Sequence, residues 1–306
     1  MTSFNHFLRE KGVSNEVRSL LYHIARSIKY INFTIRAGNT GKCGSENSFG
    51  ESQVAMDVLA DDIIAEELKR SELARLVVSE ERENVLEFDA PRGDFLVAYD
   101  PLDGSSLVNV NCSIGSIFGI WDNAKDILGS KVDENFVASC YAVYGPRITF
   151  VIAIKDKGVH EFELNDVGEF ILVEEGLKLE TDSKYFAPGN LRCCSEDPKF
   201  KSWVDDCIMS GKTLRYSGGM VPDLNHILLK GNGIFAYPRH SEYPEGKLRL
   251  LFECAPFAFV FREAGGIALN QDGEDILDTI VKDYHQTSPI FIGSEDAVKK
   301  AVKMIG

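Results

Sequence analysis

The sequence predicts an α/β protein, an α+β layered sandwich of two stacked α/β domains with mixed sheets. Three patterns predict it: helix-periodic apolar residues near the start, a run of strand-like segments, and alternating helices and strands in the second half. The chain has 306 residues, which is about two domains if one domain takes about 150. We expect an N-terminal helix-plus-sheet domain over residues 1–180 and a C-terminal α/β domain over residues 181–306.

Two helices are expected first. After Ser14, apolar residues from Val17 to Ile31 recur three and four positions apart, which predicts an amphipathic helix capped by the serine and ending near residues 37–38. Residues 54–68 show similar periodicity and predict a second helix. Short apolar runs then predict strands, the last four of them an antiparallel meander: residues 76–79, 95–99, 114–121, 137–144, 147–154 and 159–164.

Helices and strands alternate in the second half. Pro198 after Asp197 is typical of a helix start, Gly265 of a helix end, and Ser294 of a helix cap. The expected helices cover residues 198–208, 222–229, 256–264 and the segment after Ser294, and the expected strands cover residues 213–216 and 234–237.

Composition narrows the classes of function. Hydrophobic residues make up 44% and charged residues 26%, which is enough apolar material for a large core and excludes a disordered chain. The net charge of −14 argues against nucleic acid as a partner, and no apolar run approaches the ~18 residues of a membrane helix. Seven cysteines without a CxxC pair, and no secretory signal, predict a cytoplasmic protein; the alternative is a plastid or other organelle after loss of a transit peptide.

The sharpest motif is DPLDGSS at residues 100–106, directly after the strand expected at residues 95–99. The strand end would hold Asp100 in place, and Asp103 can point its carboxylate to the same region. The glycine and serines that follow expose backbone N–H groups suited to phosphate oxygens. Carboxylates beside such a turn are what a magnesium ion bridging to a phosphate requires. The alternative is an ordinary Asp-rich surface turn.

Other acids lie at comparable places. Glu80 and Glu81 end the strand expected at residues 76–79, where one suits a metal and the other suits deprotonation of water. Glu253 falls just before the helix that Pro256 opens, where an acid complements the helix dipole and can bind a metal. The alternatives are solvated glutamates and a plain helix cap.

Basic residues and glycines are the remaining candidates for substrate binding. Lys247 and Arg249 are two residues apart, so an extended chain puts both on one face, where they suit a substrate phosphate. The alternative is a solvated strand face. Residues 215–221 link a strand to a helix through two adjacent glycines, and there the backbone can approach a sugar closely.

Together these segments resemble the class 1 fructose-1,6-bisphosphatase family. The resemblance covers about residues 47–293 and is carried by residues 79–81, 95–121 and 247–266. Within the family, residues 47–50, 144–147, 187–192 and 214–223 are most similar to sedoheptulose-1,7-bisphosphatases. The resemblance implies the sugar-phosphatase fold and, as leading expectation, magnesium-dependent hydrolysis of the 1-phosphate of sedoheptulose 1,7-bisphosphate.

The resemblance also implies roles for individual residues. The implied metal ligands are Glu80, Asp100, Asp103, Glu253 and the Leu102 carbonyl. The implied catalytic residues are Asp57 and Glu81, which act on the attacking water, and Glu51, which stands where the family usually has aspartate and assists a further metal. The implied substrate contacts are Asp103, Gly104, Ser105, Ser106, Asn190, Arg215, Tyr216, Gly218, Met220, Tyr237, Lys247 and Arg249. Two or three Mg²⁺ ions per site are implied, for which Mn²⁺ can substitute.

Two alternatives stay open at this point. One is fructose 1,6-bisphosphate as the sole or second substrate, and the other is a non-catalytic relative that binds sugar phosphates. The family further implies a homodimer or homotetramer in which Arg215 reaches a neighbouring subunit.

Overall fold

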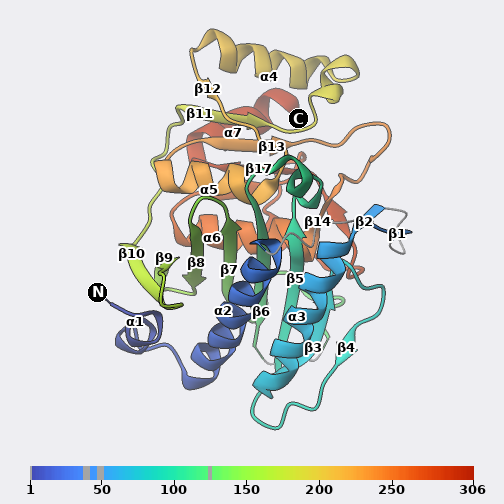
Figure 1. Ribbon diagram of the computed structural model, residues 1–306. Helices are drawn as coiled ribbons and strands as arrows, with labels where there is room; N and C mark the ends of the chain where they lie inside the picture. The colour runs from blue at the N-terminus through green and yellow to red at the C-terminus, as the bar shows by residue number, and fades with distance from the viewer. Residues whose placement is uncertain (1, 37–41, 47–51, 123–125) are drawn as a thin grey trace.

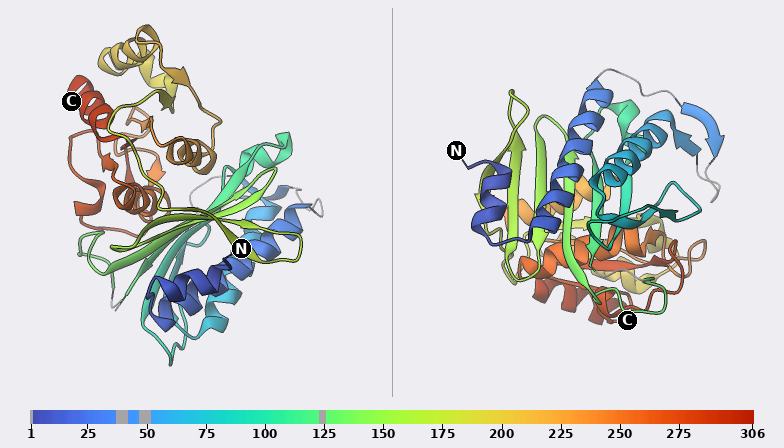
Figure 2. Two further views of the ribbon diagram at one scale, coloured as in Figure 1. Left: turned by 90° about the vertical axis from the view of Figure 1, so that its left-hand side faces the viewer. Right: turned by 90° about the horizontal axis from the view of Figure 1, so that it is seen from below.

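Two β-sheets and three layers of helices alternate through the molecule (Figure 1, Figure 2). The computed structural model describes residues 2–36, 42–46, 52–122 and 126–306. Three clusters of buried apolar side chains fill the spaces between successive layers. The expectation of a layered α/β sandwich with mixed sheets is therefore confirmed. In the described part of the chain, no helix combines the length and apolar character that a bilayer crossing requires.

The first sheet has eight strands in the order β10-β9-β8-β7-β6-β5-β3-β4. One neighbouring pair, β5 and β3 near the β4 edge, is parallel, and every other neighbouring pair is antiparallel. The strands are β3 (Ala74–Ser79), β4 (Leu86–Glu87), β5 (Phe95–Asp103), β6 (Ile114–Trp121), β7 (Phe136–Tyr144), β8 (Ile148–Ile154), β9 (Gly158–Leu164) and β10 (Phe170–Glu175). Because neighbouring parallel strands end at one edge, the acids after β3 and in the last part of β5 lie side by side.

Helices α1 (Phe4–Glu10), α2 (Asn15–Arg36) and α3 (Ala55–Ser71) cover the outer face of this sheet (Figure 2). Ser14 caps α2 as expected, since its Oγ accepts the Val17 N–H at 3.2 Å. A small antiparallel pair, β1 (Lys42–Glu46) and β2 (Ser52–Val54), precedes α3. Helix α3 packs against β3 and β5 and so lies directly behind the acidic edge of the sheet.

The second sheet has the order β12-β11-β13-β17-β15 and is covered on its outer face by α4 and α7. Its strands are β11 (Tyr185–Pro188), β12 (Thr213–Leu214), β13 (Ile234–Tyr237), β15 (Ile267–Leu269) and β17 (Ile290–Gly293). The short helix η2 (Leu191–Ser195) leads into α4 (Pro198–Met209), and α7 (Glu295–Ile305) ends the chain. The pair β14 (Leu248–Arg249) and β16 (Thr287–Ser288) stands apart from this sheet.

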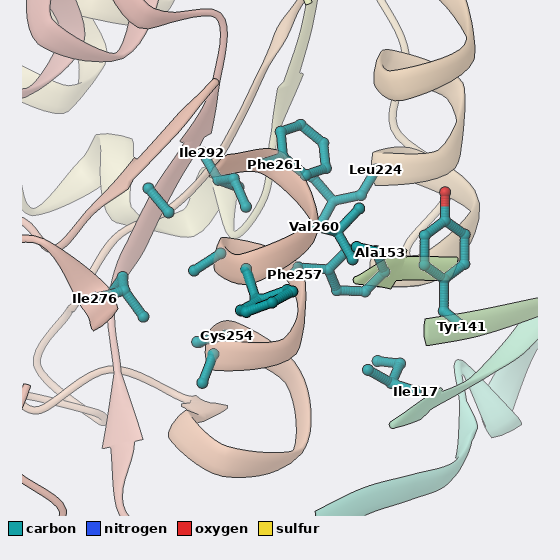
Figure 3. Close-up of a cluster of buried hydrophobic side chains, with 14 of the residues drawn as sticks. Ile117, Tyr141, Ala153, Leu224, Cys254, Phe257, Val260, Phe261, Ile276 and Ile292 are labelled. Atoms are coloured by element: carbon teal, nitrogen blue, oxygen red, sulfur yellow. The ribbon is translucent and has the colours of Figure 1, made fainter. Parts of the chain in front are cut away.

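Helices α5 (Met220–Lys230) and α6 (Ala255–Glu263) fill the space between the sheets. Figure 3 shows the apolar side chains of α6 between those of the first sheet and those of the second half of the chain: Ile117, Tyr141 and Ala153 on one side, Ile276 and Ile292 on the other. A π-helical turn, η3 (Leu250–Cys254), precedes α6, and η4 (Ile276–Asp278) follows β15. All of η3 is buried, so Glu253 enters the interior with its apolar neighbours.

Some local expectations need correction. The strand expected at residues 95–99 continues to Asp103, because a bulge accommodates Pro101 and Leu102: Asp100 is opposite Ile117, and Asp103 is opposite Gly115. The strand expected at residues 213–216 pairs only at Thr213–Leu214. Ser294 stands at the N-cap of α7, but its Oγ accepts the Gly233 N–H at 3.2 Å and makes no capping bond to the helix.

Candidate active site

A cavity of about 400 Å³ lies between the acidic edge of the first sheet and the N-terminal end of α5. The predicted site residues that line it are Glu80, Glu81, Asp100, Leu102, Asp103, Gly104, Ser105, Ser106, Tyr216, Gly218, Met220, Tyr237, Lys247 and Glu253. They come from distant parts of the sequence: Glu80 and Glu253 are 173 positions apart. The fold therefore brings most of the predicted site together.

Asp100 and Asp103 both owe their position to the bulge of β5. Asp100 accepts the Leu102 N–H at 2.8 Å, which closes the local turn around Pro101. The Asp103 carboxylate accepts the N–H groups of Met220 at 3.1 Å and Val221 at 2.6 Å. These last bonds tie the first sheet to the start of α5.

Glu253 reaches the same place from the π-helical turn before α6. It is only 7% exposed and accepts the Arg249 N–H at 2.7 Å. One oxygen from each of Asp100, Asp103 and Glu253 lies within 4.8 Å of the others. Three buried carboxylates at this spacing form a candidate cation site.

The electrostatics of this cluster favour a bound cation. Burial and the charges of Glu80, Asp103 and Glu253 raise the pKa of Asp100 well above its ordinary value. Burial and the charges of Glu80 and Asp103 likewise raise the pKa of Glu253 well above its ordinary value. Burial raises the pKa of Asp103 to about 6, although its two backbone hydrogen bonds oppose the shift. A divalent cation would compensate the cost of keeping these groups ionised together.

The donor set fits a hard cation. It consists of carboxylate oxygens, and Glu80 and Leu102 also line the cavity. Oxygen ligands of this type suit Mg²⁺ or Mn²⁺, whereas no thiolate or imidazole is among the cavity-lining residues described. Glu80 also lies near a cation of the chain itself, since its Oε1 is 3.7 Å from the Arg249 Nε.

The turn after Asp103 has the backbone form that the motif predicts. Gly104 has φ 77°, in the left-handed region that favours glycine, and the 3-10 helix η1 (Ser105–Val110) begins directly after it. A Cβ at Gly104 would meet Gly219 Cα at 3.5 Å, an ordinary contact, so the positive φ is the main constraint.

Other cavity-lining segments carry polar groups suited to a sugar. Residues 217–219 form a loop held by Asp223, which accepts the Ser217 N–H at 2.8 Å. Burial raises the pKa of Tyr237 to about 12, so its hydroxyl stays protonated and can donate a hydrogen bond. Lys247 also lines the cavity, with its Nζ 5.9 Å from the centroid of the Tyr243 ring. These segments therefore combine hydroxyl donors with the cation of Lys247.

Four of the predicted site residues do not line the cavity, and a fifth lies outside the described residues. Asn190 is 7% exposed and donates to Cys193 Sγ, and Asp57 is buried in the first turn of α3. The Arg249 side chain lies beside Glu80, and the exposed Arg215 guanidinium donates to the Leu214 carbonyl. Glu51 lies outside the described residues.

The cavity also contains residues that the sequence analysis missed: Gly219, Phe235, Tyr243 and Leu248. Gly219 adjoins the predicted Gly218, so the Gly-Gly signal pointed to it. Tyr243 precedes Pro244 in an exposed turn, and no periodic pattern distinguishes it from any other surface aromatic residue.

Comparison with known proteins gives one consistent family. Residues 3–175 match the family model "Fructose-1-6-bisphosphatase, N-terminal domain", and residues 179–306 match "Fructose-1-6-bisphosphatase, C-terminal domain". The chain is 40% identical to the class 1 fructose-1,6-bisphosphatase of Pelobacter propionicus, with 97% of this chain and 91% of the relative covered. It is 41% identical to the protein of the same name from Syntrophotalea carbinolica, with 98% and 92% covered.

Solved structures agree with the sequence relatives. Leishmania major fructose-1,6-bisphosphatase in its holo form superposes with a TM-score of 0.92 at 32% identity, covering 99% of this chain and 98% of that one. A Toxoplasma gondii protein provisionally named sedoheptulose-1,7 bisphosphatase superposes with a TM-score of 0.91 at 30% identity, with the same coverage.

Proposed function

Because the chain belongs to the fructose-1,6-bisphosphatase family, and is thus a phosphoric monoester hydrolase of sugar bisphosphates, we propose that it removes the 1-phosphate of fructose 1,6-bisphosphate with Mg²⁺ as cofactor. The observation that carries the proposal is the cluster of Asp100, Asp103 and Glu253 on the wall of a cavity that Lys247 and three tyrosines also line. The nearly full-length relatives at 40% identity bear this name, which supports the six-carbon substrate.

Sedoheptulose 1,7-bisphosphate is the second candidate. The Toxoplasma structure and the segments at residues 187–192 and 214–223 favour it. The names of the sequence relatives do not bear out the preference for the seven-carbon sugar, so that preference stays a prediction. Both sugars carry the phosphate that the proposed reaction removes, and they differ in the distance to the distal phosphate.

The proposed chemistry divides the site into two ends. At the acidic end, Asp100, Asp103, Glu253, Glu80 and the Leu102 carbonyl would hold Mg²⁺. Bound Mg²⁺ supplies charge neutralisation to the phosphoryl oxygens and to the leaving alkoxide. The backbone N–H groups of the turn at residues 104–106 would orient the 1-phosphate against these carboxylates.

Protein groups would also handle the proton of the attacking water. Glu81 lines the cavity next to Glu80 and is the proposed proton acceptor, and Asp57, buried in the first turn of α3, is proposed to help orient the water. At the other end, Lys247, Tyr216 and Tyr237 would bind the sugar and its distal phosphate. A local cation matters here because the net charge of −14 repels a bisphosphate at long range.

We further propose a homodimer or homotetramer and a cytoplasmic location. Ile208, Met209 and Leu214, in the segment from α4 to β12, are 58%, 86% and 51% exposed. These three exposed apolar side chains precede Arg215 in the sequence, and the Arg215 side chain does not line the cavity of its own chain. Both features suit a subunit contact that delivers Arg215 to a neighbouring site.

The test is phosphate release from both sugar bisphosphates, with Mg²⁺ and with a chelator. We expect hydrolysis of fructose 1,6-bisphosphate that the chelator abolishes, and the ratio of kcat/KM for the two sugars then gives the preference. Metal-dependent hydrolysis of the seven-carbon sugar alone would overturn the substrate assignment. Hydrolysis of neither would favour the non-catalytic, sugar-phosphate-binding relative.

A further inference from the structure

A buried carboxylate lies behind the acidic edge of the first sheet, outside the cavity. Asp61 is on α3, four residues after Asp57 and therefore on the same helix face. It is 3% exposed, and nothing in the sequence pattern or in the proposed chemistry assigns it a role. An acid at this depth requires compensation for the loss of water, so its partners indicate what it does.

Asp61 has three partners from two strands and a turn. Its Oδ1 accepts the hydroxyls of Ser79 at 2.6 Å and Tyr99 at 2.7 Å. Its Oδ2 forms an ion pair with the Arg82 Nε at 2.5 Å. Tyr99 is completely buried, and burial together with the Asp61 charge raises its pKa well above the ordinary value. The Tyr99 hydroxyl therefore stays a donor to Asp61.

These partners enclose the turn that carries Glu80 and Glu81. Ser79 is the last residue of β3, and its Oγ accepts the Glu81 N–H at 3.2 Å while donating to Asp61. Arg82 closes the turn through its N–H to the Ser79 carbonyl at 3.3 Å. Asp61 thus fixes both ends of a four-residue turn, through Ser79 at the first position and Arg82 at the last.

Further bonds hold the same turn from other directions. The Glu80 N–H donates to the Tyr99 carbonyl at 3.1 Å, and the His285 Nε2 lies 3.0 Å from the Arg82 carbonyl. Arg82 also donates to Asp62, whose side chain is 64% exposed. Among these groups, Asp61 is the buried charge that Arg82, Ser79 and Tyr99 share.

We propose that Asp61 is a positioning residue for Glu80 and Glu81. By fixing their turn, Asp61 sets the affinity of the site for divalent cations, through Glu80, and the position of the proton acceptor, Glu81. The inference rests on the proposed function, because those two glutamates are the proposed ligand and proton acceptor. Asp61 acts through Ser79 and Arg82, and it touches neither substrate nor metal.

The test compares Asp61→Asn with Asp62→Asn, which removes the exposed acid that pairs with the same arginine. For Asp61→Asn we expect kcat for the sugar bisphosphate to fall about tenfold to a hundredfold, as displaced catalytic groups do, with KM changed less than about threefold. Mn²⁺ binding to the protein, followed by calorimetry without any sugar, should weaken at least about tenfold. Asp62→Asn should stay within about twofold of wild type in both measurements.

A second variant covers the case in which Asp61→Asn does not fold. Ser79→Ala removes only the link between Asp61 and the Glu81 N–H, and it should show the same split between kcat and KM. If either folded variant changed the melting temperature but left kcat and Mn²⁺ affinity at the Asp62→Asn level, Asp61 would be merely structural. If the wild type cleaved neither sugar, the proposed function would fail, and Mn²⁺ affinity alone would decide the positioning role. A wild type that binds no Mn²⁺ overturns both.

Discussion

The carboxylate of Asp103 accepts the backbone N–H of Val221 at 2.6 Å, and so a residue of the first sheet is bonded to the first turn of α5. The same carboxylate contributes an oxygen to the cluster with Asp100 and Glu253. One side chain therefore joins the acidic cluster of the cavity to α5, the helix that follows the loop at residues 217–219. A substitution that moves either the acidic cluster or the start of α5 is therefore expected to shift the other.

Asp103→Asn tests this double role. The asparagine amide lacks the negative charge that would bind the metal. If its NH₂ group faces α5, this donor meets the N–H donors of Met220 and Val221, and their hydrogen bonds are lost. We expect kcat/KM to fall at least about a hundredfold, which corresponds to about 2.7 kcal/mol of transition-state stabilisation. Steady-state kinetics with Mg²⁺ varied check this, and Asp89→Asn, at an exposed loop position, is the charge control. Equal kinetics for the two variants would contradict a metal role for Asp103.

Metal removal should destabilise the protein. Burial and mutual repulsion raise the pKa values of Asp100 and Glu253, so ionising both acids in the metal-free fold costs free energy that a bound cation would offset. At a Mg²⁺ concentration about 100 times its Kd, we expect about 2.7 kcal/mol of extra stability. Thermal melts at pH 7.5 with Mg²⁺ and with EDTA measure it. The gain should shrink in Glu253→Gln, and identical melts for the wild type in both buffers would count against a cation site.

Lys247→Met tests the substrate end. The methionine keeps the unbranched side chain but removes the cation, so a charge-assisted hydrogen bond of about 1.5–3 kcal/mol to a phosphate is lost. We expect KM for the bisphosphate to rise about tenfold or more, with a smaller change in kcat. Lys230→Met, at an exposed position at the end of α5, is the matched control. A fall in kcat at unchanged KM would place Lys247 in the chemical step instead.

His160 should make stability depend on pH. Its Nδ1 accepts the Gly176 N–H at 3.1 Å, and its Nε2 lies 2.9 Å from the Lys157 carbonyl, a pattern that requires the neutral imidazole. Burial lowers its pKa below the ordinary value of 6.5. Between that lowered pKa and 6.5 the unfolded chain binds more protons than the folded one. The contribution of His160 is therefore complete above about pH 6.5 and is lost as the pH falls through that interval.

Melting temperatures of wild type and His160→Gln between about pH 5 and pH 7.5 check this expectation. The variant should show a flatter dependence, because glutamine does not titrate. His6→Gln is the control, since the side chain of His6 is half-exposed. A steeper dependence in His160→Gln than in the wild type would refute the assignment.

Sequence patterns predicted most elements because helical and strand periodicity are local properties. The helix after Ser14 and the meander of β6 to β9 follow from the burial of one face of each element. The bulge in β5 could not be predicted in this way, since it depends on how Asp100 and Asp103 pair with β6. The expected end of the strand at Tyr99 was wrong for that reason.

The residues of the candidate site were likewise predicted only in part from the sequence. Acids next to strand ends and before a helix are visible in the sequence, and Asp100, Asp103 and Glu253 were all predicted. Tyr243 on the cavity wall and Asp61 behind it were not, because a surface aromatic residue and a helix acid have no distinctive spacing. Only their distances to other segments distinguish them.

The sequence by itself determined the order of helices and strands, the family and the kinds of side chain available for metal and phosphate. The tertiary structure decided which carboxylates meet within 4.8 Å, and that Arg249 lies beside Glu80 while Arg215 lies away from the cavity. The physical reason is that hydrophobic periodicity specifies which face of an element is buried. The separation of groups far apart in the chain depends instead on how the sheets and helices pack against one another.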